Sequence, residues 1–218
     1  MPIREEFGQI FNSGQDGIAM MRERAIAWPT LLLAALVAIT MAACDSGDDQ
    51  QSTGGALLGG DFTLDSASSS LSLHDFQGKN VLLYFGYTHC PDVCPMTLAN
   101  VGAALDLLDE AERSRVQGLF VTVDPERDSV EVVTDYARYF HPGIIGLSGS
   151  KTAIKDVARK YQVFYNKFFD QDSESEKDYS VTHADHLFLI NGQGAVVDIM
   201  SHNTKPEDIV EAVRAHLR

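Results

Sequence analysis

Two cysteines in the stretch YFGYTHCPDVCPMT, residues 84–97, carry the most reactive chemistry in this sequence. Cys90 and Cys94 are separated by three residues, and a proline directly follows each of them. A pair of this kind serves as a structural disulfide, as a redox catalyst or as part of a metal site. A disulfide between them would close a loop too short to restrain the unfolded chain much, so a purely structural role explains the pair poorly.

The expected position of the pair at the start of a helix favours reactive sulfur. Free backbone N–H groups and the positive end of the helix dipole stabilise thiolates there, so we expect both Cys90 and Cys94 to ionise readily. Residues four apart share one helix face with about 6 Å of rise between them, so both sulfurs can point at a single atom.

Two thiolates on a short loop form a soft pair of ligands. They suit Cu(I), whereas zinc normally takes four ligands and this chain has only two thiols to offer beyond its N-terminal segment. A histidine imidazole would complete a site with two sulfurs and one nitrogen. The same sulfurs can also form a disulfide, so thiol–disulfide exchange is equally open. The spacing alone does not separate these interpretations.

Seven histidines are candidates for the third ligand. His183 and His186 lie in SVTHADHLF, directly before a strand that should lie near the cysteine turn, and the residue pattern does not choose between them. His89 adjoins Cys90, but neighbouring side chains on an extended backbone diverge, so we expect it beside the site rather than in it. Surface positions are the simpler interpretation for three others: His141, His202 and His216.

The elements that must position these residues alternate between strand and helix from residue 61 onward. The apolar runs at 81–85 and 118–124 are typical of buried strands, and the Asn-Gly turn at 191–192 predicts a hairpin between HLFLI and AVVDIM. Predicted helices occupy 96–108, 128–140 with Asp128 as N-cap, 151–161 with Ser150 as N-cap, and 206–217.

This order predicts an α/β, thioredoxin-like fold. Its central mixed β-sheet is flanked by helices and carries an N-terminal β-hairpin extension at 62–64 and 70–73. The cysteine pair then lies where the first long strand turns into a helix.

The N-terminal region has the pattern of an export signal. Arg22 and Arg24 precede an apolar run at 25–43, which ends at Cys44. The pattern predicts a lipoprotein signal with Cys44 as the lipidated first residue of the mature protein, although Met41 stands where leucine is usual. The alternative is an uncleaved membrane anchor. Both place the rest of the chain on a membrane, facing the periplasm or another extracytoplasmic space.

Three segments follow from this pattern. Residues 1–43 form the signal region, in which Met20 or Met21 is the better translation start; residues 44–60 form a flexible tether; and residues 61–218 form the domain. The formal net charge of -14, without a basic patch, argues against binding to nucleic acid. The acidic stretch DQDSESEKDY at 170–179 is typical of a solvated loop.

Five longer motifs follow one another along the domain: GKNVLLYFGYTHCPDVCP, VTVDPERDS, YARYFHPGIIGLSGS, DVARKYQVFY and YSVTHADHLFLINGQG. Together they strongly resemble the Sco/SenC family of copper-binding, thioredoxin-like proteins. The resemblance implies a domain that binds one copper ion, as Cu(I) or Cu(II), through two cysteines and one histidine. It also implies a copper donor protein and an acceptor, cytochrome c oxidase subunit II, whose binuclear copper site such proteins help to build by delivering copper or by reducing its cysteines.

The resemblance also selects one histidine. The family histidine follows Tyr-x-Val-x and stands seven residues before the isoleucine of the next strand, so Tyr179, Val181 and Ile190 identify His183 rather than His186.

One position departs from the family pattern. Family members often have Asp directly before the histidine, whereas this chain has Thr182 there and an Asp only at position 185. A missing carboxylate can alter how the imidazole is oriented. His186 therefore stays an additional candidate ligand. Asp124 of VDPERD matches a family acidic position near the site, and it serves either as a turn carboxylate or in redox chemistry and metal transfer.

Two classes of function remain. The first is a metallochaperone in which Cys90, Cys94 and His183 hold copper until a partner displaces them. The alternative is an extracytoplasmic thiol–disulfide oxidoreductase independent of copper, in which one cysteine attacks and the other resolves. Peroxidase activity is less favoured, because peroxidatic cysteines usually lie in a different local motif. Whether the protein is an enzyme in the ordinary sense stays open, with the metallochaperone preferred.

Overall fold

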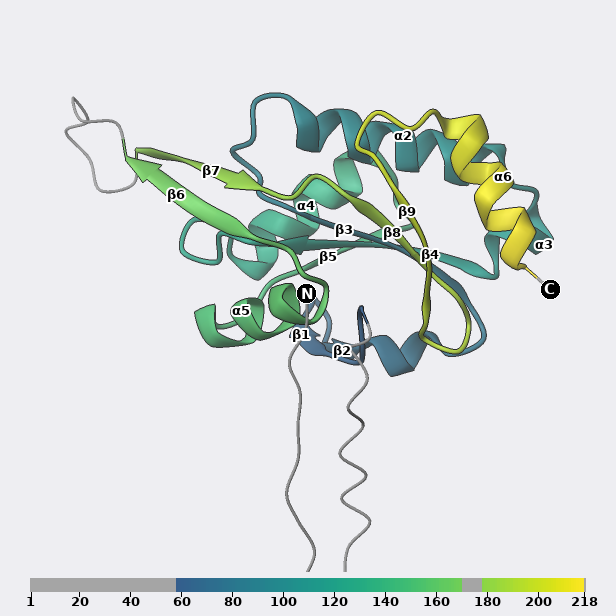
Figure 1. Cartoon of the computed structure of the whole chain (residues 1–218), viewed down its shortest axis with the longest axis horizontal. Helices are drawn as coiled ribbons and strands as arrows, with labels where there is room; N and C mark the ends of the chain where they lie inside the picture. Colours follow the sequence, from purple (N-terminus) through teal and green to yellow (C-terminus); the bar gives the residue numbers. More distant parts are fainter. Residues whose placement is uncertain (1–57, 170–177, 218) are drawn as a thin grey trace, which may run out of the picture. The chain divides into compact units, whose positions relative to one another are not determined.

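A five-stranded mixed sheet with the strand order β5-β4-β3-β8-β9 forms the centre of the fold (Figure 1). The computed structural model describes residues 58–169 and 178–217. Strands β3, β4 and β5 run parallel to one another, whereas β8 is antiparallel to both β3 and β9. The five strands are β3 (Asn80–Gly86), β4 (Val116–Thr122), β5 (Ile144–Leu147), β8 (Leu187–Ile190) and β9 (Val196–Met200). The predicted α/β class and mixed central sheet are confirmed.

Helices cover this sheet. In the view of Figure 1, α2 and α6 lie above the strands, and α5 lies below them beside the hairpin of β1 and β2. Helix α2 also contacts α6 and α4. The helices are α2 (Val93–Leu107), α3 (Glu110–Arg113), α4 (Val130–Phe140), α5 (Lys151–Lys160) and α6 (Pro206–His216), with a 3-10 helix η1 at Leu73–Phe76.

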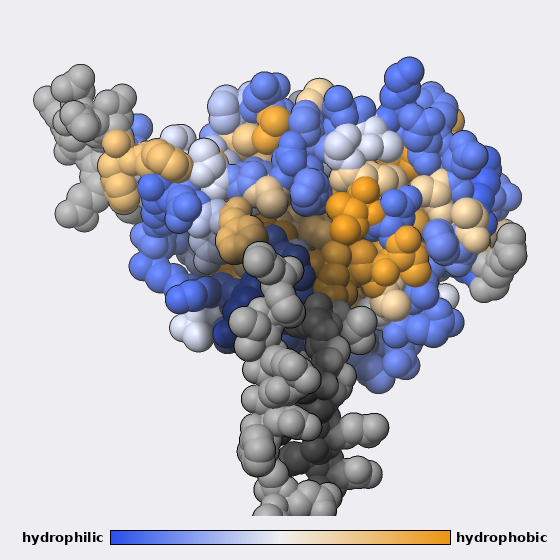
Figure 2. Space-filling model, viewed as in Figure 1, coloured by the Kyte–Doolittle hydropathy of each residue, from blue (hydrophilic) through white to orange (hydrophobic). Residues whose placement is uncertain are grey.

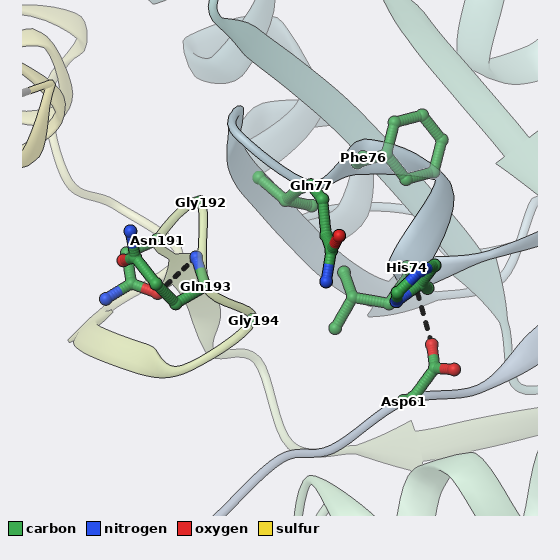
Figure 3. Close-up of a pocket in the computed structure, with 10 residues that line it drawn as sticks. Asp61, His74, Phe76, Gln77, Asn191, Gly192, Gln193 and Gly194 are labelled. Atoms are coloured by element: carbon green, nitrogen blue, oxygen red, sulfur yellow. Dashed lines mark hydrogen bonds between the residues drawn. The ribbon is translucent and has the colours of Figure 1, made fainter.

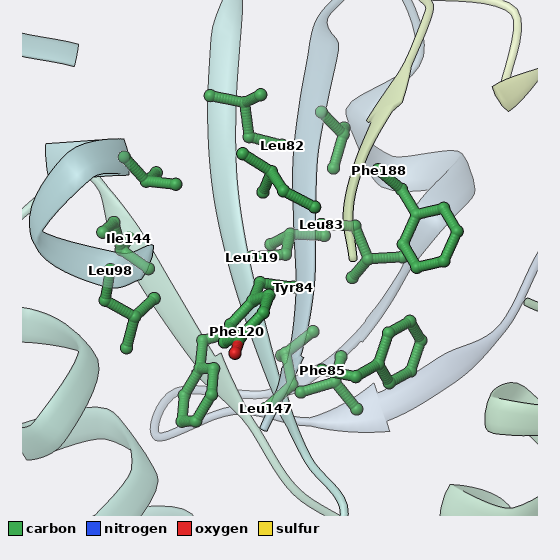
Figure 4. Packing of buried hydrophobic residues seen from close by; sticks show 14 of the residues in the cluster. Leu82, Leu83, Tyr84, Phe85, Leu98, Leu119, Phe120, Ile144, Leu147 and Phe188 are labelled. Carbon is green, nitrogen blue, oxygen red and sulfur yellow. The ribbon is translucent and has the colours of Figure 1, made fainter. Parts of the chain in front are cut away.

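Strand β3 crosses the middle of the hydrophobic core. All seven of its residues are buried, and Leu83 pairs in register with Leu119 of β4 and Phe188 of β8. Figure 4 shows the side chains of β3 packed among those of its neighbours. Because each large apolar side chain buried in this way contributes about 1.5–3 kcal/mol, the carboxyl end of β3 is firmly fixed. The cysteine loop starts at that end.

Two small hairpins extend the fold. The predicted N-terminal hairpin is present as β1 (Thr63–Asp65) and β2 (Ser70–Ser72), which pair antiparallel. A second hairpin, of β6 (Tyr165–Phe169) and β7 (Tyr179–His183), was not predicted. It forms its own two-stranded sheet and projects from the body at the left of Figure 1. The acidic stretch predicted as a loop lies mostly outside the described residues, and its last residue, Tyr179, is buried in β7.

Two predicted helix starts are wrong. Helix α4 is capped by Ser129, whose side chain accepts a hydrogen bond from the Val132 amide, and not by Asp128. Asp128 is fully buried and accepts hydrogen bonds from threonines instead. Helix α2 begins at Val93 rather than at Met96. Cys94 therefore lies within the first turn of α2, where free N–H groups are still available.

Candidate metal centre

The loop from β3 into α2 brings Cys90 and Cys94 to the carboxyl end of the sheet. Cys90 precedes the helix, and its amide donates to the Tyr87 carbonyl at 3.3 Å. Cys94 is completely buried, whereas Cys90 is partly exposed. Gly86 allows this packing, because a Cβ atom at that position would lie only 2.7 Å from the Cys94 sulfur.

Asp128 holds the same loop in place. Its carboxylate accepts hydrogen bonds from the Thr88 amide at 2.9 Å, from the Thr88 hydroxyl at 2.6 Å and from the Thr122 hydroxyl at 2.7 Å. It thus connects the residue two positions before Cys90 to the end of β4. Sequence reasoning missed this role. The available signal was the motif TVDPERD, in which Thr122 and Asp128 lie on either side of one turn.

The β6–β7 hairpin brings His183 to the cysteines from across the loop. Its Nε2 atom lies 3.3 Å from the Cys94 sulfur, and its Nδ1 atom lies 2.9 Å from the Ala184 carbonyl oxygen. A carbonyl can only accept, so Nδ1 carries the proton and the lone pair of the neutral ring is on Nε2. The rings of Tyr84 and Tyr87 meet the imidazole edge to face, with centroids 6.2 and 5.8 Å away.

These three side chains form a candidate metal site. The two sulfurs and one imidazole nitrogen all lie within 4.8 Å of one another. Sulfur ligands bind transition metals at about 2.3 Å, so two ligands of one ion lie no more than roughly 4.6 Å apart. The cluster therefore fits a single soft metal ion after only a small contraction. Within residues 58–169 and 178–217, it is the one group of at least three His, Cys, Asp or Glu side chains with this geometry.

The two sulfurs differ in their acidity. A hydrogen bond from the Cys94 thiol lowers the pKa of Cys90 well below the ordinary thiol value, and hydrogen bonds from the backbone amides of residues 92 and 94 lower it further. The same hydrogen bond to Cys90, together with burial, raises the pKa of Cys94. The expectation that both cysteines ionise readily is thus wrong for the metal-free protein. In the metal-free protein the more accessible sulfur, that of Cys90, is the one that ionises first.

Tyr84 also contacts the buried sulfur. Its hydroxyl donates to Cys94 at 3.6 Å, and burial raises the pKa of this tyrosine, so it remains a neutral donor.

The remaining candidate residues lie apart from the cluster. His186 has a side chain that is 53% exposed and pairs with Asp185 at 3.8 Å. Asp185 also contacts His202. Asp124 is fully buried, but its oxygens are taken by Arg127 and Tyr179. Cys44, the predicted lipidation site, lies outside the described residues.

A hollow lies at the other end of β3, and neither cysteine nor His183 lines it. It has a volume of about 120 Å³, and Val81 near the start of β3 contributes to its wall. Figure 3 shows polar side chains around it. The backbone amide of His74 donates to the Asp61 carboxylate, and the backbone amide of Gln193 donates to the side-chain oxygen of Asn191.

Comparison with known proteins identifies the family. The model of the SCO1/SenC family matches residues 50–218. The chain belongs to the SCO1/SenC family. The resemblance noted in the sequence is therefore confirmed.

Relatives in this family come from both plants and animals. The mitochondrial SCO1 homolog 1 of Arabidopsis thaliana is 38% identical over 168 residues, which cover 77% of this chain and 49% of that protein. The mitochondrial SCO2 homolog of Homo sapiens is 38% identical over 160 residues, which cover 72% of this chain and 59% of that protein. The chain thus spans about half to three fifths of the length of these relatives.

Solved structures of SCO1/SenC proteins share the fold. Apo Sco1 from Thermus thermophilus matches with a TM-score of 0.66 at 38% identity, covering 72% of this chain and 90% of that one. Copper-bound ScoI from Arabidopsis thaliana matches with a TM-score of 0.66 at 36% identity, covering 74% and 98%. The thioredoxin-like fold class is confirmed. Within the part of the chain that the structure describes, no helix has the length and apolar character needed to cross a membrane.

Proposed function

We propose that this protein binds one copper ion through Cys90, Cys94 and His183 and supplies it to another copper protein. The observation that carries the proposal is the convergence of two sulfurs and an imidazole nitrogen within 4.8 Å, brought together from two distant parts of the chain. Membership of the SCO1/SenC family adds support, as do the solved relatives from Arabidopsis thaliana and yeast that are described as having copper bound.

The donor set favours copper over zinc. Thiolate is a soft ligand that selects Cu(I), and an imidazole also suits Cu(II). Structural zinc sites nearly always take four protein ligands, and the cluster offers three. The Nε2 lone pair of His183 already faces the sulfurs, so the imidazole needs no change of tautomer before it binds a metal.

The accessibility of the ligands suits transfer to a partner. Cys90 is partly exposed, whereas Cys94 is buried beneath the loop. An incoming thiolate or imidazole of an acceptor therefore meets the metal from the Cys90 side and displaces that ligand first. Stepwise exchange of this kind keeps the copper coordinated throughout, because the other two ligands still hold it.

The acceptor that we propose is subunit II of cytochrome c oxidase, whose binuclear copper site would receive the metal or have its cysteines reduced. A copper donor protein would load the site. We further propose that the chain is attached to a membrane through lipidated Cys44 or through an uncleaved anchor, that residues 44–60 act as the tether, and that the domain faces the periplasm or another extracytoplasmic space. This arrangement gives the metal site reach toward a membrane-embedded partner.

Copper titration of single-residue variants tests this proposal. The full chain, purified in detergent under reducing conditions, is loaded with copper as wild type, His183→Ala and His186→Ala. We expect one copper per chain in the wild type and in His186→Ala, and an affinity lowered at least tenfold in His183→Ala, because a ligand is lost. Equal binding by His183→Ala and the wild type would exclude His183 as a ligand.

The asymmetry of the two sulfurs supports a second candidate function, thiol–disulfide exchange without copper. A partly exposed thiolate beside a buried thiol is the arrangement in which one cysteine attacks and the other resolves. The Cys90 thiolate would attack one sulfur of a partner disulfide, which forms a mixed disulfide and releases the other partner sulfur as a thiolate. The Cys94 thiol would pass its proton to that thiolate, attack the Cys90 sulfur, displace the partner sulfur still bound there as a second thiolate, and leave a Cys90–Cys94 disulfide. Reduction of an oxidised acceptor peptide by copper-free protein, at equal rates in wild type and His183→Ala, would favour this function.

A further inference from the structure

The strand that carries His183 belongs to a hairpin outside the main sheet. Strands β6 and β7 pair only with each other within the described residues, and His183 is the last residue of β7. Two-stranded hairpins are marginally stable by themselves in water. Figure 2 shows apolar side chains toward the far end of this hairpin, where Phe168 and Phe169 are more than half exposed. Contacts to the body must therefore hold β7 in place if His183 is to stay near the cysteines.

A buried carboxylate at the end of β4 supplies such a contact. Asp124 is fully buried, and its Oδ1 atom accepts a hydrogen bond of 2.6 Å from the Tyr179 hydroxyl. Its Oδ2 atom pairs with the Arg127 guanidinium, and that guanidinium also donates to the Tyr179 carbonyl oxygen at 2.8 Å. Asp124 and Arg127 thus hold both the side chain and the backbone of the first residue of β7.

Two cations make cation–π contacts with the ring of the same tyrosine. The Arg127 guanidinium lies 3.7 Å from the Tyr179 ring centroid, and the Lys167 ammonium lies 4.3 Å from it. Lys167 comes from β6 and pairs with Glu126 at 2.6 Å. Both strands of the hairpin are therefore tied to the segment 124–127, and cation–π attraction adds about 0.5–2 kcal/mol for each cation.

The tie at Tyr179 determines where His183 lies. Alternate residues of a strand share one face, so Tyr179, Val181 and His183 all point toward the body. Tyr179 and Val181 are buried, as this register requires. The separation of four residues corresponds to roughly 13 Å along the strand. A second route runs through Tyr87, whose ring centroid lies 5.8 Å from both the Arg127 guanidinium carbon and the His183 ring centroid.

We propose that Asp124 is a positioning residue: by binding Tyr179 and Arg127, it latches the β6–β7 hairpin to the end of β4 and so holds His183 against the cysteines. This inference rests on the proposed function, in which His183 is a copper ligand. It assigns Asp124 an indirect role, in which the carboxylate binds no metal and takes no part in redox chemistry. The role is distinct from that of Asp128, which holds the cysteine loop.

Two variants test the latch without removing any ligand. Tyr179→Phe deletes the hydroxyl bound to Asp124 and keeps the ring that both cations contact. Asp124→Asn removes the charge that Arg127 pairs with. Tyr161→Phe is the matched control, because this other buried tyrosine donates to the Gly60 carbonyl at 3.1 Å, a bond that involves neither strand of the hairpin nor the segment 124–127. If Asp124→Asn does not fold, Tyr179→Phe carries the test.

The first measurement is amide hydrogen exchange on the copper-free full chain in detergent. We expect the amides of residues 180–183 to exchange at least tenfold faster in Tyr179→Phe than in the wild type, and to be unchanged in Tyr161→Phe. Unchanged exchange in Tyr179→Phe would overturn the proposal. This result does not depend on copper, so it tests the latch even if the wild type fails to bind the metal and the proposed function falls.

The second measurement is titration with Cu(II), followed by electron paramagnetic resonance. We expect the affinity to fall 10- to 100-fold in Tyr179→Phe and Asp124→Asn, as is usual when a residue that orients a ligand is changed. The nitrogen hyperfine splitting from His183 should weaken in both, while Tyr161→Phe keeps it. A full nitrogen signal and wild-type affinity in both latch variants would overturn the proposal, because His183 would then be held without Asp124.

Discussion

Replacing Gly86 with alanine should damage the metal site through a single methyl group. A Cβ atom at this position would lie 2.7 Å from the Cys94 sulfur, 2.9 Å from Cε2 of Phe120 and 3.1 Å from Cε1 of Tyr84. All three of these side chains are fully or almost fully buried, so none can swing into solvent. The methyl group must therefore displace at least one of them.

The size of the displacement follows from ordinary contact distances. Relieving the sulfur contact to 3.4 Å, where normal van der Waals contact begins, requires a shift of about 0.7 Å (3.4 minus 2.7). Metal sites require ligand distances within about 0.2 Å of ideal. Overpacking of a buried site by one methyl group typically costs about 1–3 kcal/mol of stability. We expect Gly86→Ala to lose stability in this range and to bind copper at least tenfold more weakly.

Gly118→Ala is the matched control for this experiment. Gly118 lies on the neighbouring strand β4, and a Cβ atom there would lie 3.0 Å from Cγ1 of Ile144, away from the cysteines. We expect it to lose stability without weakening copper binding. Denaturant unfolding gives the stability, and competition with a copper chelator gives the affinity. If Gly86→Ala is folded and binds copper as tightly as Gly118→Ala, the close packing of Cys94 against β3 does not set the geometry of the site.

Two further predictions concern the loop and its sulfurs. Asp128→Asn should lose about 2–3 kcal/mol of stability and unfold at a lower denaturant concentration, because the amide N–H would face the threonine groups that now donate to the carboxylate. Asp106→Asn is the control, since the Asp106 side chain is 70% exposed. Equal losses of stability in the two variants would refute the role of Asp128. In the reduced, copper-free protein, iodoacetamide should modify Cys90 before Cys94. The reactive thiolate forms as the pH rises through the pKa, and the pKa of Cys90 is lowered, so the rate of Cys90 modification should not change with pH between about pH 6 and 8. Mass spectrometry measures this rate, and a tenfold rise per pH unit in that range would contradict the lowered pKa.

Local patterns were sufficient for most of the fold. The apolar runs that form β3 and β4 allowed few alternatives to buried strands, and the Asn-Gly turn predicted the β8–β9 hairpin. Ser150 does cap α5, as its position before the amphipathic run predicted. These features depend on residues close together in the sequence, so a single sequence contains the information needed.

The features that were missed depend on contacts between distant residues. Asp128 has the sequence context of an N-cap, and only the approach of Thr88, forty residues earlier, turns it into an anchor for the cysteine loop. The β6–β7 hairpin has no short turn signal, because an acidic stretch separates its strands. Its register pairs Tyr165 with His183, and that pairing cannot be obtained from hydrophobic periodicity.

The same limit applies to the candidate site. The cysteine pair was evident from residue type and spacing, whereas His183 and His186 could not be separated by the residue pattern without the family resemblance. The structure brings His183 within 3.3 Å of the Cys94 sulfur and leaves His186 exposed beside Asp185. The unequal acidity of the two cysteines was also missed, because it arises from the hydrogen bond between them and from burial, neither of which the sequence displays.

X-ray absorption at the copper edge tests the central proposal most directly. The full chain is loaded with one equivalent of Cu(I) in detergent, and the ligands around the metal are counted from the fine structure. The proposed site predicts two sulfur ligands and one nitrogen ligand per copper, with the nitrogen lost in His183→Ala and retained in His186→Ala. A copper environment of nitrogen and oxygen alone, or one unchanged by His183→Ala, would contradict the assignment of Cys90, Cys94 and His183 as the copper site.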